Sequence, residues 1–178
     1  MTIQRVLARV FPLMLCVLGS AAWADALSEM EELIQNKQWA QAQQRLQTAA
    51  QQNPKTAASP QWRLLNSQIL AGQGKPKEAM EGLQALIQEF PELPEPYNNL
   101  GVLLAAQGQW DEALTALQSA IQARPHYKVA LQNLGDLYSA LAQQAYQQAK
   151  SAGNGPGLLP LPAPAAETTT STNTRTLR

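Results

Sequence analysis

The chain has 178 residues, of which 45% are hydrophobic and only 6% aromatic, and its formal net charge is zero. This length fits one domain with flanking segments, and the abundance of alanine, leucine and glutamine over β-branched residues favours helices over sheet. Because a near-neutral chain with scattered charges has no electrostatic attraction for phosphate backbones, we expect no nucleic-acid partner.

Residues 1–24 have the layout of a secretory signal peptide. Two arginines precede an apolar run, and Ala-Trp-Ala at residues 22–24 supplies the small-residue pattern of a cleavage site ahead of Asp25. The apolar run is shorter than the roughly 20 residues that a membrane-spanning helix needs. We therefore predict cleavage after residue 24 and no membrane span in the mature chain, with an uncleaved anchor as the alternative.

The single cysteine, Cys16, lies inside this predicted signal peptide. Lipidation at Cys16 is disfavoured because Leu15 is bulky and apolar residues continue beyond the cysteine. The mature chain then contains no cysteine, so its fold must depend on a packed core rather than on disulfides.

The next elements repeat with a period of 34 residues. Residues 60–93 and 94–127 both contain apolar residues at helical spacing, a glycine break, a second helical run and a terminating proline. The matching pairs are Leu70 and Leu104, Gly74 and Gly108, Ala79 and Ala113, Leu83 and Leu117, and Pro91 and Pro125. Each segment is therefore predicted to be a helix–turn–helix unit.

The pattern in residues 94–127 resembles the tetratricopeptide repeat, a helix–turn–helix unit of 34 residues. The positions that match the family in order are Tyr97, Leu100, Gly101, Gly108, Trp110, Ala113, Leu117, Ala120 and Pro125, with Leu104 in place of the usual tyrosine. Residues 60–93 match less completely, because Asn66 and Ser67 replace the usual leucine and glycine.

Weaker units flank these two. An earlier unit over residues 25–56 aligns on Trp39, and residues 57–59 interrupt the spacing before the next unit. A fourth unit begins at Lys128 and keeps the family pattern through Tyr138, but it has no glycine or proline where the turn should fall. We predict that residues 128–150 form one long capping helix, with a turn near residues 142–144 as the alternative.

Residues 151–178 are rich in proline and threonine and have no periodicity, which predicts a disordered tail. The fold predicted for the whole chain is thus all-α: an α-solenoid of tetratricopeptide repeats over residues 25–150, with a C-terminal capping helix and a disordered tail.

No residue cluster favours catalysis or a cofactor. His126 is the only histidine and is predicted to lie in a solvated loop between units, where it cannot form a metal cluster alone. The adjacent acidic pair at residues 111–112 is explained by its place in the first turn of a helix, where it complements the helix dipole. We predict no metal, no cofactor and no enzymatic activity.

The tryptophans are first interpreted as packing residues. Trp39 and Trp110 occupy the family position at which an aromatic side chain packs the two helices of a unit together. Trp62 lies off this register, and partial exposure with a partner contact is left open for it.

The resemblance implies a binding surface. In the family, first helices line a concave groove that holds a peptide or partner segment, while second helices form the outer wall. Carried over to this chain, the groove residues are Glu31, Gln35, Gln68, Glu95, Asn98, Asn99, Val102, Gln132, Asn133 and Asp136. Asn99 and Asn133 occupy a recurring asparagine position that implies contact with the backbone of a bound segment. The groove lacks the basic residues with which some members of the family clamp a C-terminal carboxylate.

The resemblance and the signal peptide together predict an exported, non-enzymatic protein-binding module that acts as a scaffold or adaptor for envelope proteins. The bacterial periplasm is the expected compartment, with secretion or outer-membrane association as alternatives. A second hypothesis is an accessory regulator of a cell-wall or polysaccharide enzyme. The partner is expected to be a protein or peptide, and self-association stays open.

Overall fold

The structure is a computed structural model that describes residues 26–152, apart from the side chain of Thr56. Within this range the regular structure is α-helical and contains no strand, which confirms the predicted all-α class. The predicted signal peptide and all but the start of the predicted tail lie outside the described residues. Backbone contacts divide the chain into two units, Met1–Ala142 and Gln143–Arg178.

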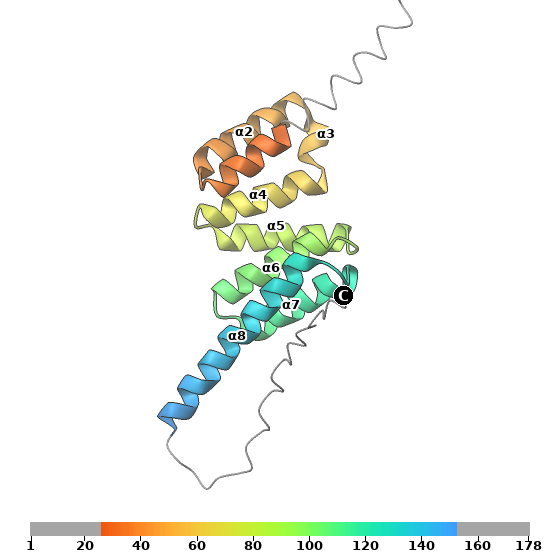
Figure 1. Ribbon diagram of the computed structural model, residues 1–178. Helices are drawn as coiled ribbons and strands as arrows, with labels where there is room; N and C mark the ends of the chain where they lie inside the picture. Colours follow the sequence, from red (N-terminus) through yellow and green to blue (C-terminus); the bar gives the residue numbers. More distant parts are fainter. Residues whose placement is uncertain (1–25, 153–178) are drawn as a thin grey trace, which may run out of the picture. The chain divides into compact units, whose positions relative to one another are not determined.

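The helices follow one another as helix pairs (Figure 1). A helix over residues 26–35 is followed by α2 (Trp39–Gln52), the short α3 (Pro54–Ala57), α4 (Pro60–Gly72), α5 (Pro76–Glu89), α6 (Pro94–Ala106), α7 (Trp110–Ala123) and α8 (Lys128–Ser151). The first helices of the pairs are residues 26–35, α4 and α6, and the second helices are α2, α5 and α7. The long helix α8 is the first helix of the fourth unit.

Proline and acidic residues explain where several helices begin. Pro60, Pro76 and Pro94 are the first residues of α4, α5 and α6, where the missing N–H of proline costs no helical hydrogen bond. The hydroxyl of Ser59 accepts a hydrogen bond from the backbone N–H of Trp62 and caps α4. Asp111 lies in the first turn of α7, as expected from the helix dipole.

The turns inside the helix pairs use the left-handed backbone region. Gly74 has φ 77° between α4 and α5, and Gly108 has φ 74° between α6 and α7, as the glycine breaks predicted. In the first pair the same place is occupied by Lys37, with φ 56°, the only non-glycine residue at positive φ among the described residues. A lysine there has a steric cost that glycine avoids.

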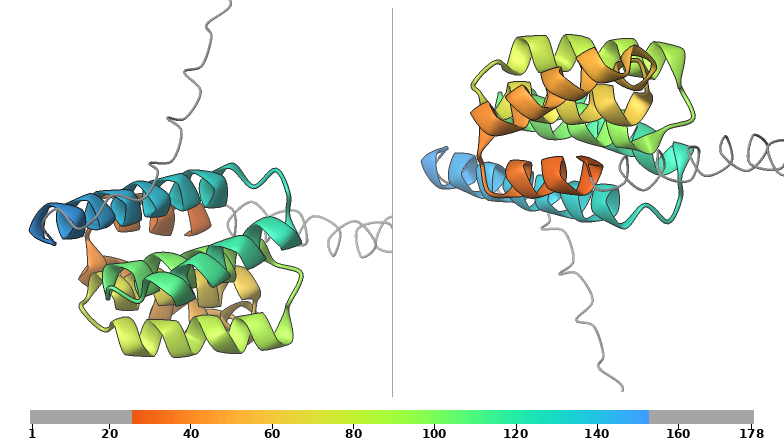
Figure 2. Two further views of the ribbon diagram at one scale, coloured as in Figure 1. Left: turned by 90° about the horizontal axis from the view of Figure 1, so that it is seen from below. Right: turned by 90° about the horizontal axis from the view of Figure 1, so that it is seen from above.

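The core lies where second helices pack on first helices. Each second helix buries an alanine and a leucine four residues later, the pairs being Ala42 and Leu46, Ala79 and Leu83, and Ala113 and Leu117. Helix α6 packs against both α5 and α7, and α4 packs against α5, so successive pairs stack on one another. The views along the stack show the helices of successive pairs one behind another (Figure 2).

Trp62 belongs to the core, so the partial exposure left open for it is wrong. It lies near the start of α4 with only 2% of its surface exposed, in a cluster with Met30, Leu46 and Ile69. The reason is α3, which is inserted between α2 and α4 and is in contact with both. The interruption at residues 57–59 therefore alters the approach to α4, and Trp62 fills the resulting space.

Small residues set the closest helix contacts. A Cβ atom on Gly101 of α6 would lie 2.8 Å from Cγ of Leu117 in α7, so the glycine is required by the packing. Ser67 replaces this glycine in α4 and is 2% exposed. Here the facing helix supplies the small residue, because a Cβ on Gly82 of α5 would come within 3.1 Å of the Ser67 hydroxyl.

Helix α8 is continuous from Lys128 to Ser151, so the structure has one helix and not a turn near residues 142–144. In the first unit it packs through Ala130 and Leu137, and Leu137 joins a cluster with Ala113 and Leu117 of α7. In the second unit, the described residues 143–152 are exposed. None of the helices within residues 26–152 is long and apolar enough to cross a membrane.

Candidate binding groove

A groove of about 300 Å³ opens beside the first helices and is here called the central groove. Residues from the helix over 26–35, α4 and α6 line it, with contributions from the start of α2 and from α5. The lining residues are Ile34, Trp39, Ser67, Gln68, Ala71, Gly72, Leu83, Asn99, Val102 and Leu103. None of these ten side chains carries a charge, and Val102 is 44% exposed.

One wall of the central groove depends on a tight contact between Trp39 and Gly72. A Cβ atom on Gly72 would lie 2.5 Å from the indole ring of Trp39, so only glycine lets the ring lie flat against α4. Trp39 therefore packs α2 against the next pair, and the ring is partly exposed along the groove. The packing role predicted for this tryptophan is present, and the groove-lining role was missed.

A second hollow of about 310 Å³ lies between the helix over residues 26–35 and α4. Its lining residues are Leu27, Glu31, Ile34, Gln35, Gln61, Leu64, Leu65 and Gln68. Ile34 and Gln68 line both this hollow and the central groove, so the two surfaces are continuous.

The predicted groove residues divide by position. Glu31, Gln35 and Gln68 line the second hollow, and Gln68, Asn99 and Val102 line the central groove. The structure thus brings five of the ten residues onto one continuous surface, while their contact with a partner stays a prediction.

Asn98 is placed differently from the prediction. It is 3% exposed, so its side chain is not presented to a ligand. Its Oδ1 accepts a hydrogen bond from Nδ2 of Asn133 at 2.8 Å, which ties α6 to α8. Because neighbouring residues point about 100° apart on a helix, Asn99 reaches the groove while Asn98 faces α8.

Asn133, Asn98 and Asn99 form a chain of amides that ends at the central groove. Asn133 donates to Asn98, and Nδ2 of Asn98 donates to Oδ1 of Asn99 at 3.1 Å. No hydrogen bond within residues 26–152 engages Nδ2 of Asn99. The chain therefore fixes the orientation of the Asn99 amide and leaves its N–H groups for an acceptor in the groove.

The remaining predicted residues line neither the groove nor the hollow. Glu95 is ion-paired with Arg124 across 2.9 Å, which ties the start of α6 to the end of α7. Gln132 and Asp136 are exposed on α8. His126 is exposed in the loop between α7 and α8, as predicted.

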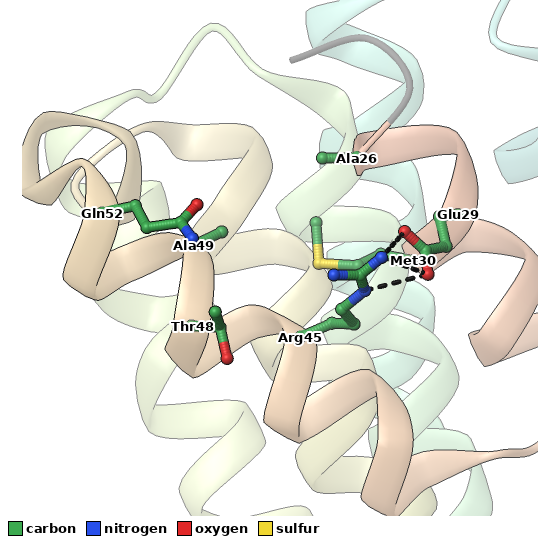
Figure 3. Close-up of a pocket in the computed structure, with 7 residues that line it drawn as sticks. All are labelled: Ala26, Glu29, Met30, Arg45, Thr48, Ala49 and Gln52. Atoms are coloured by element: carbon green, nitrogen blue, oxygen red, sulfur yellow. Dashed lines mark hydrogen bonds and ion pairs between the residues drawn. The ribbon is translucent and has the colours of Figure 1, made fainter. Parts of the chain in front are cut away.

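A further pocket of about 370 Å³ differs from the groove in its chemistry (Figure 3). It lies between the helix over residues 26–35 and α2. The guanidinium of Arg45 points at the carboxylate of Glu29, with Nε 2.9 Å and Nη2 2.7 Å from Oε1. Because both charges are satisfied by each other, this pocket offers no free cation for an anionic ligand.

The titratable groups do not gather into a catalytic arrangement. No cluster of histidine, cysteine, aspartate and glutamate in residues 26–152 is placed to hold a metal ion. The hydrogen bond from Arg63 lowers the pKa of Glu89, and burial raises the pKa of Tyr127. Both groups belong to structural contacts, since Arg63 links α4 to the end of α5 and Tyr127 lies 5.3 Å from the guanidinium of Arg124.

Sequence-family comparison gives the class of protein. Two tetratricopeptide repeat models match residues 33–101 and 94–127, which together span more than half of the chain. The chain belongs to the tetratricopeptide repeat family, as the repeat pattern predicted. Domains of this family generally mediate protein–protein interaction. No curated protein matches the chain in sequence.

Solved structures agree on the fold. The Sgt2 tetratricopeptide domain from Aspergillus fumigatus superposes with a TM-score of 0.56 at 15% identity, covering 79% of this chain and 90% of that one. The first such domain of human RPAP3 gives 0.55 at 13% identity, covering 68% and 93%. MamA gives 0.50 at 19% identity, covering 76% and 78%. At these identities the likeness shows the helical-repeat fold alone.

Proposed function

We propose that the central groove binds a segment of a partner protein and that the chain is a non-enzymatic scaffold or adaptor. The observation that carries this proposal is the groove lining itself. Ten uncharged residues from three first helices and two second helices meet there, and Val102 is exposed at the surface. An exposed apolar surface in a groove is stabilised by burial against apolar ligand groups.

The lining chemistry specifies the kind of segment. The apolar surface of Trp39 and Val102 suits an uncharged, apolar side chain of the partner. The free N–H groups of Asn99 suit a backbone carbonyl beside it, and Gln68 adds a neutral amide. Because none of the lining residues is basic, a ligand recognised through a carboxylate is disfavoured.

We further propose that the protein works outside the cytoplasm, in the bacterial periplasm or at the outer membrane. Residues 1–24 support this through their signal-peptide layout. The partner is then an envelope protein, and an enzyme of cell-wall or polysaccharide synthesis is the narrower alternative. Cell fractionation and N-terminal sequencing of the mature protein test the location, with Asp25 as the expected first residue. A cytoplasmic protein that still begins at residue 1 would contradict export.

Site-specific photo-crosslinking tests the groove. A photoreactive phenylalanine replaces Val102 in the central groove or, as the matched control, Gln118, which is exposed on α7. We expect a reproducible crosslinked partner from position 102 and none from position 118. The same products from both positions, or none from position 102, would contradict the proposal.

A further inference from the structure

The fourth unit leaves bare a helix face that is covered in each of the three earlier units. The register of the repeats aligns Met30, Ser67, Gly101 and Gly135. Met30 is 1% exposed, Ser67 is 2% exposed, and Gly101 is buried beneath α7. At Gly135, by contrast, no heavy atom beyond its own helix and chain neighbours lies within 4 Å of the place that a Cβ would occupy.

Apolar side chains flank Gly135 on the same face. Leu131 lies four residues before it and Tyr138 three residues after it, a spacing that places all three on one side of the helix. Leu131 is 46% exposed and Tyr138 is 49% exposed. Their counterparts in α6, Tyr97 and Leu104, are partly buried. We name Leu131, Gly135 and Tyr138 the α8 face.

The chain does not supply its own cover for this face. Thirty-four residues after Ala113, Leu117 and Ala120 of α7 stand Gln147, Ser151 and Asn154, so the apolar pattern of a second helix is lost. In addition, α8 continues to Ser151 without the turn that returns α7 onto α6. Residues 153–178 contain no alanine that is followed four residues later by leucine.

A second copy of this chain also lacks a free helix of the required kind. The alanine–leucine pairs of α2, α5 and α7 are already buried, with exposed fractions between 0% and 6%. The corresponding pair in α8 begins with Ala130, which is fully buried against the stack. Offering any of these to another molecule would expose the core.

We propose that the α8 face docks an amphipathic helix of another protein, which completes the fourth unit in trans. The occupant carries an alanine followed four residues later by leucine, with the small residue and its backbone close to Gly135. This is the chemistry that α7 presents to Gly101, where the approach leaves no room for a Cβ. The proposal concerns a surface separate from the central groove, so either surface operates without the other.

A peptide with the sequence of residues 109–124 is the probe, because it contains α7, the native cover of the equivalent face. It is titrated into the full chain, and backbone amide shifts are followed by NMR. We expect saturable binding with the largest shifts at Leu131, Gly135 and Tyr138. A matched peptide with Leu117→Asp is expected not to bind, because the charge replaces the side chain that meets the glycine.

Gly135→Leu is the decisive variant. It has open space around it and replaces a helical glycine with a better helix former, so we expect it to fold at least as stably as the wild type. Peptide affinity should fall by about tenfold or more, because the leucine blocks close helix approach. Asp136→Leu is the control, since position 136 points about 100° away on the same helix and should leave affinity unchanged.

Three outcomes would overturn the proposal. These are no saturable binding up to the solubility limit of the peptide, affinity that Gly135→Leu leaves intact, and shifts confined to residues of the central groove. Sedimentation of the protein alone adds a further test. A dimer that Gly135→Leu dissociates would assign the face to a second copy instead. Val102→Asp should not change peptide affinity, which separates this result from failure of the groove proposal.

Discussion

Residues 94–127 and residues 128–142 begin alike and end differently. Both carry the same first-helix pattern, but α7 returns onto Gly101 whereas nothing within residues 26–152 covers Gly135. The residue that decides between these outcomes stands at the turn. Gly108 adopts φ 74°, and 34 residues later the chain has Ala142, which continues α8. Alanine is the best helix former and avoids the left-handed region, so the helix does not turn.

This comparison teaches that an apolar helix pattern does not determine whether the helix will be covered. The apolar positions of α6 and α8 are nearly interchangeable in sequence, and they differ in exposure because one chain turns back and the other does not. Substitutions at equivalent positions are therefore expected to have opposite effects on stability.

The largest expected effect comes from removing the side chain that covers Gly101. Leu117→Ala opens a cavity at a residue that is 1% exposed, and it should lower the free energy of unfolding by about 2–5 kcal/mol. Tyr138→Ala, on the α8 face, should change it by less than about 0.5 kcal/mol. Urea unfolding monitored by circular dichroism measures both. Similar losses for the two variants would show that the α8 face is covered in solution.

The next effect is an opposite response of two glycines to one substitution. Gly101→Ala places a Cβ 2.8 Å from Leu117 and should destabilise the protein by about 1–3 kcal/mol. Gly135→Ala meets no atom and should stabilise α8 by up to about 1 kcal/mol. Both substitutions gain the same helix propensity, so the difference between them isolates the packing cost. Equal changes in unfolding free energy would refute the assigned contact.

The turn residues should show a smaller reciprocal effect. Gly108→Ala forces alanine into φ 74° and should cost about 1–2 kcal/mol. Lys37 already bears such a cost at φ 56°, so Lys37→Gly should stabilise the first pair by up to about 1 kcal/mol. Thermal unfolding of both variants beside the wild type checks the signs. A lower melting temperature for Lys37→Gly would contradict the strain assigned to this turn.

The smallest effect concerns Arg63, which occupies the repeat position of Tyr97 and Leu131. There α4 is joined to α5 by an ion pair with Glu89 at 2.7 Å instead of by apolar contact. The hydrogen bond from Arg63 lowers the pKa of Glu89 below the ordinary 4.5. The ionised carboxylate is thus favoured in the folded state, so the stabilisation is fully present above pH 4.5 and is lost as the pH falls through the lowered pKa.

Arg63→Gln measures this contribution. The difference in unfolding free energy between wild type and variant should be small, because the pair is exposed and screened by salt. It should shrink as the pH is lowered from 6 to about 3. A difference that grows toward low pH would contradict the direction of the pKa change.

Much of the fold follows from local signals in the sequence. Prolines at the starts of α4, α5 and α6, together with Gly74 and Gly108 at the turns, act through the backbone of single residues. For that reason their effect is readable without knowledge of the tertiary contacts. The unbroken α8 follows in the same way from the absence of a turn residue near 142.

The features that sequence reasoning missed depend on contacts between distant segments. Trp62 is buried because α3 changes the approach to α4, and no local pattern near Trp62 records that insertion. Asn98 is buried because Asn133 of α8 bonds to it, which leaves Asn99 at the groove. Trp39 lines the groove because Gly72, in the next helix pair, lets its ring approach. A tryptophan paired with a distant glycine was the available signal.

The most direct test of the central claim is the affinity of the crosslinked partner for Val102→Asp beside the matched control Gln118→Asp. Both side chains are exposed, so both variants should unfold at nearly the wild-type temperature. We predict a loss of about tenfold or more for Val102→Asp, because a charge would stand in an uncharged groove, and no loss for Gln118→Asp. Equal affinities for the two variants would contradict the assignment of the central groove as the binding surface.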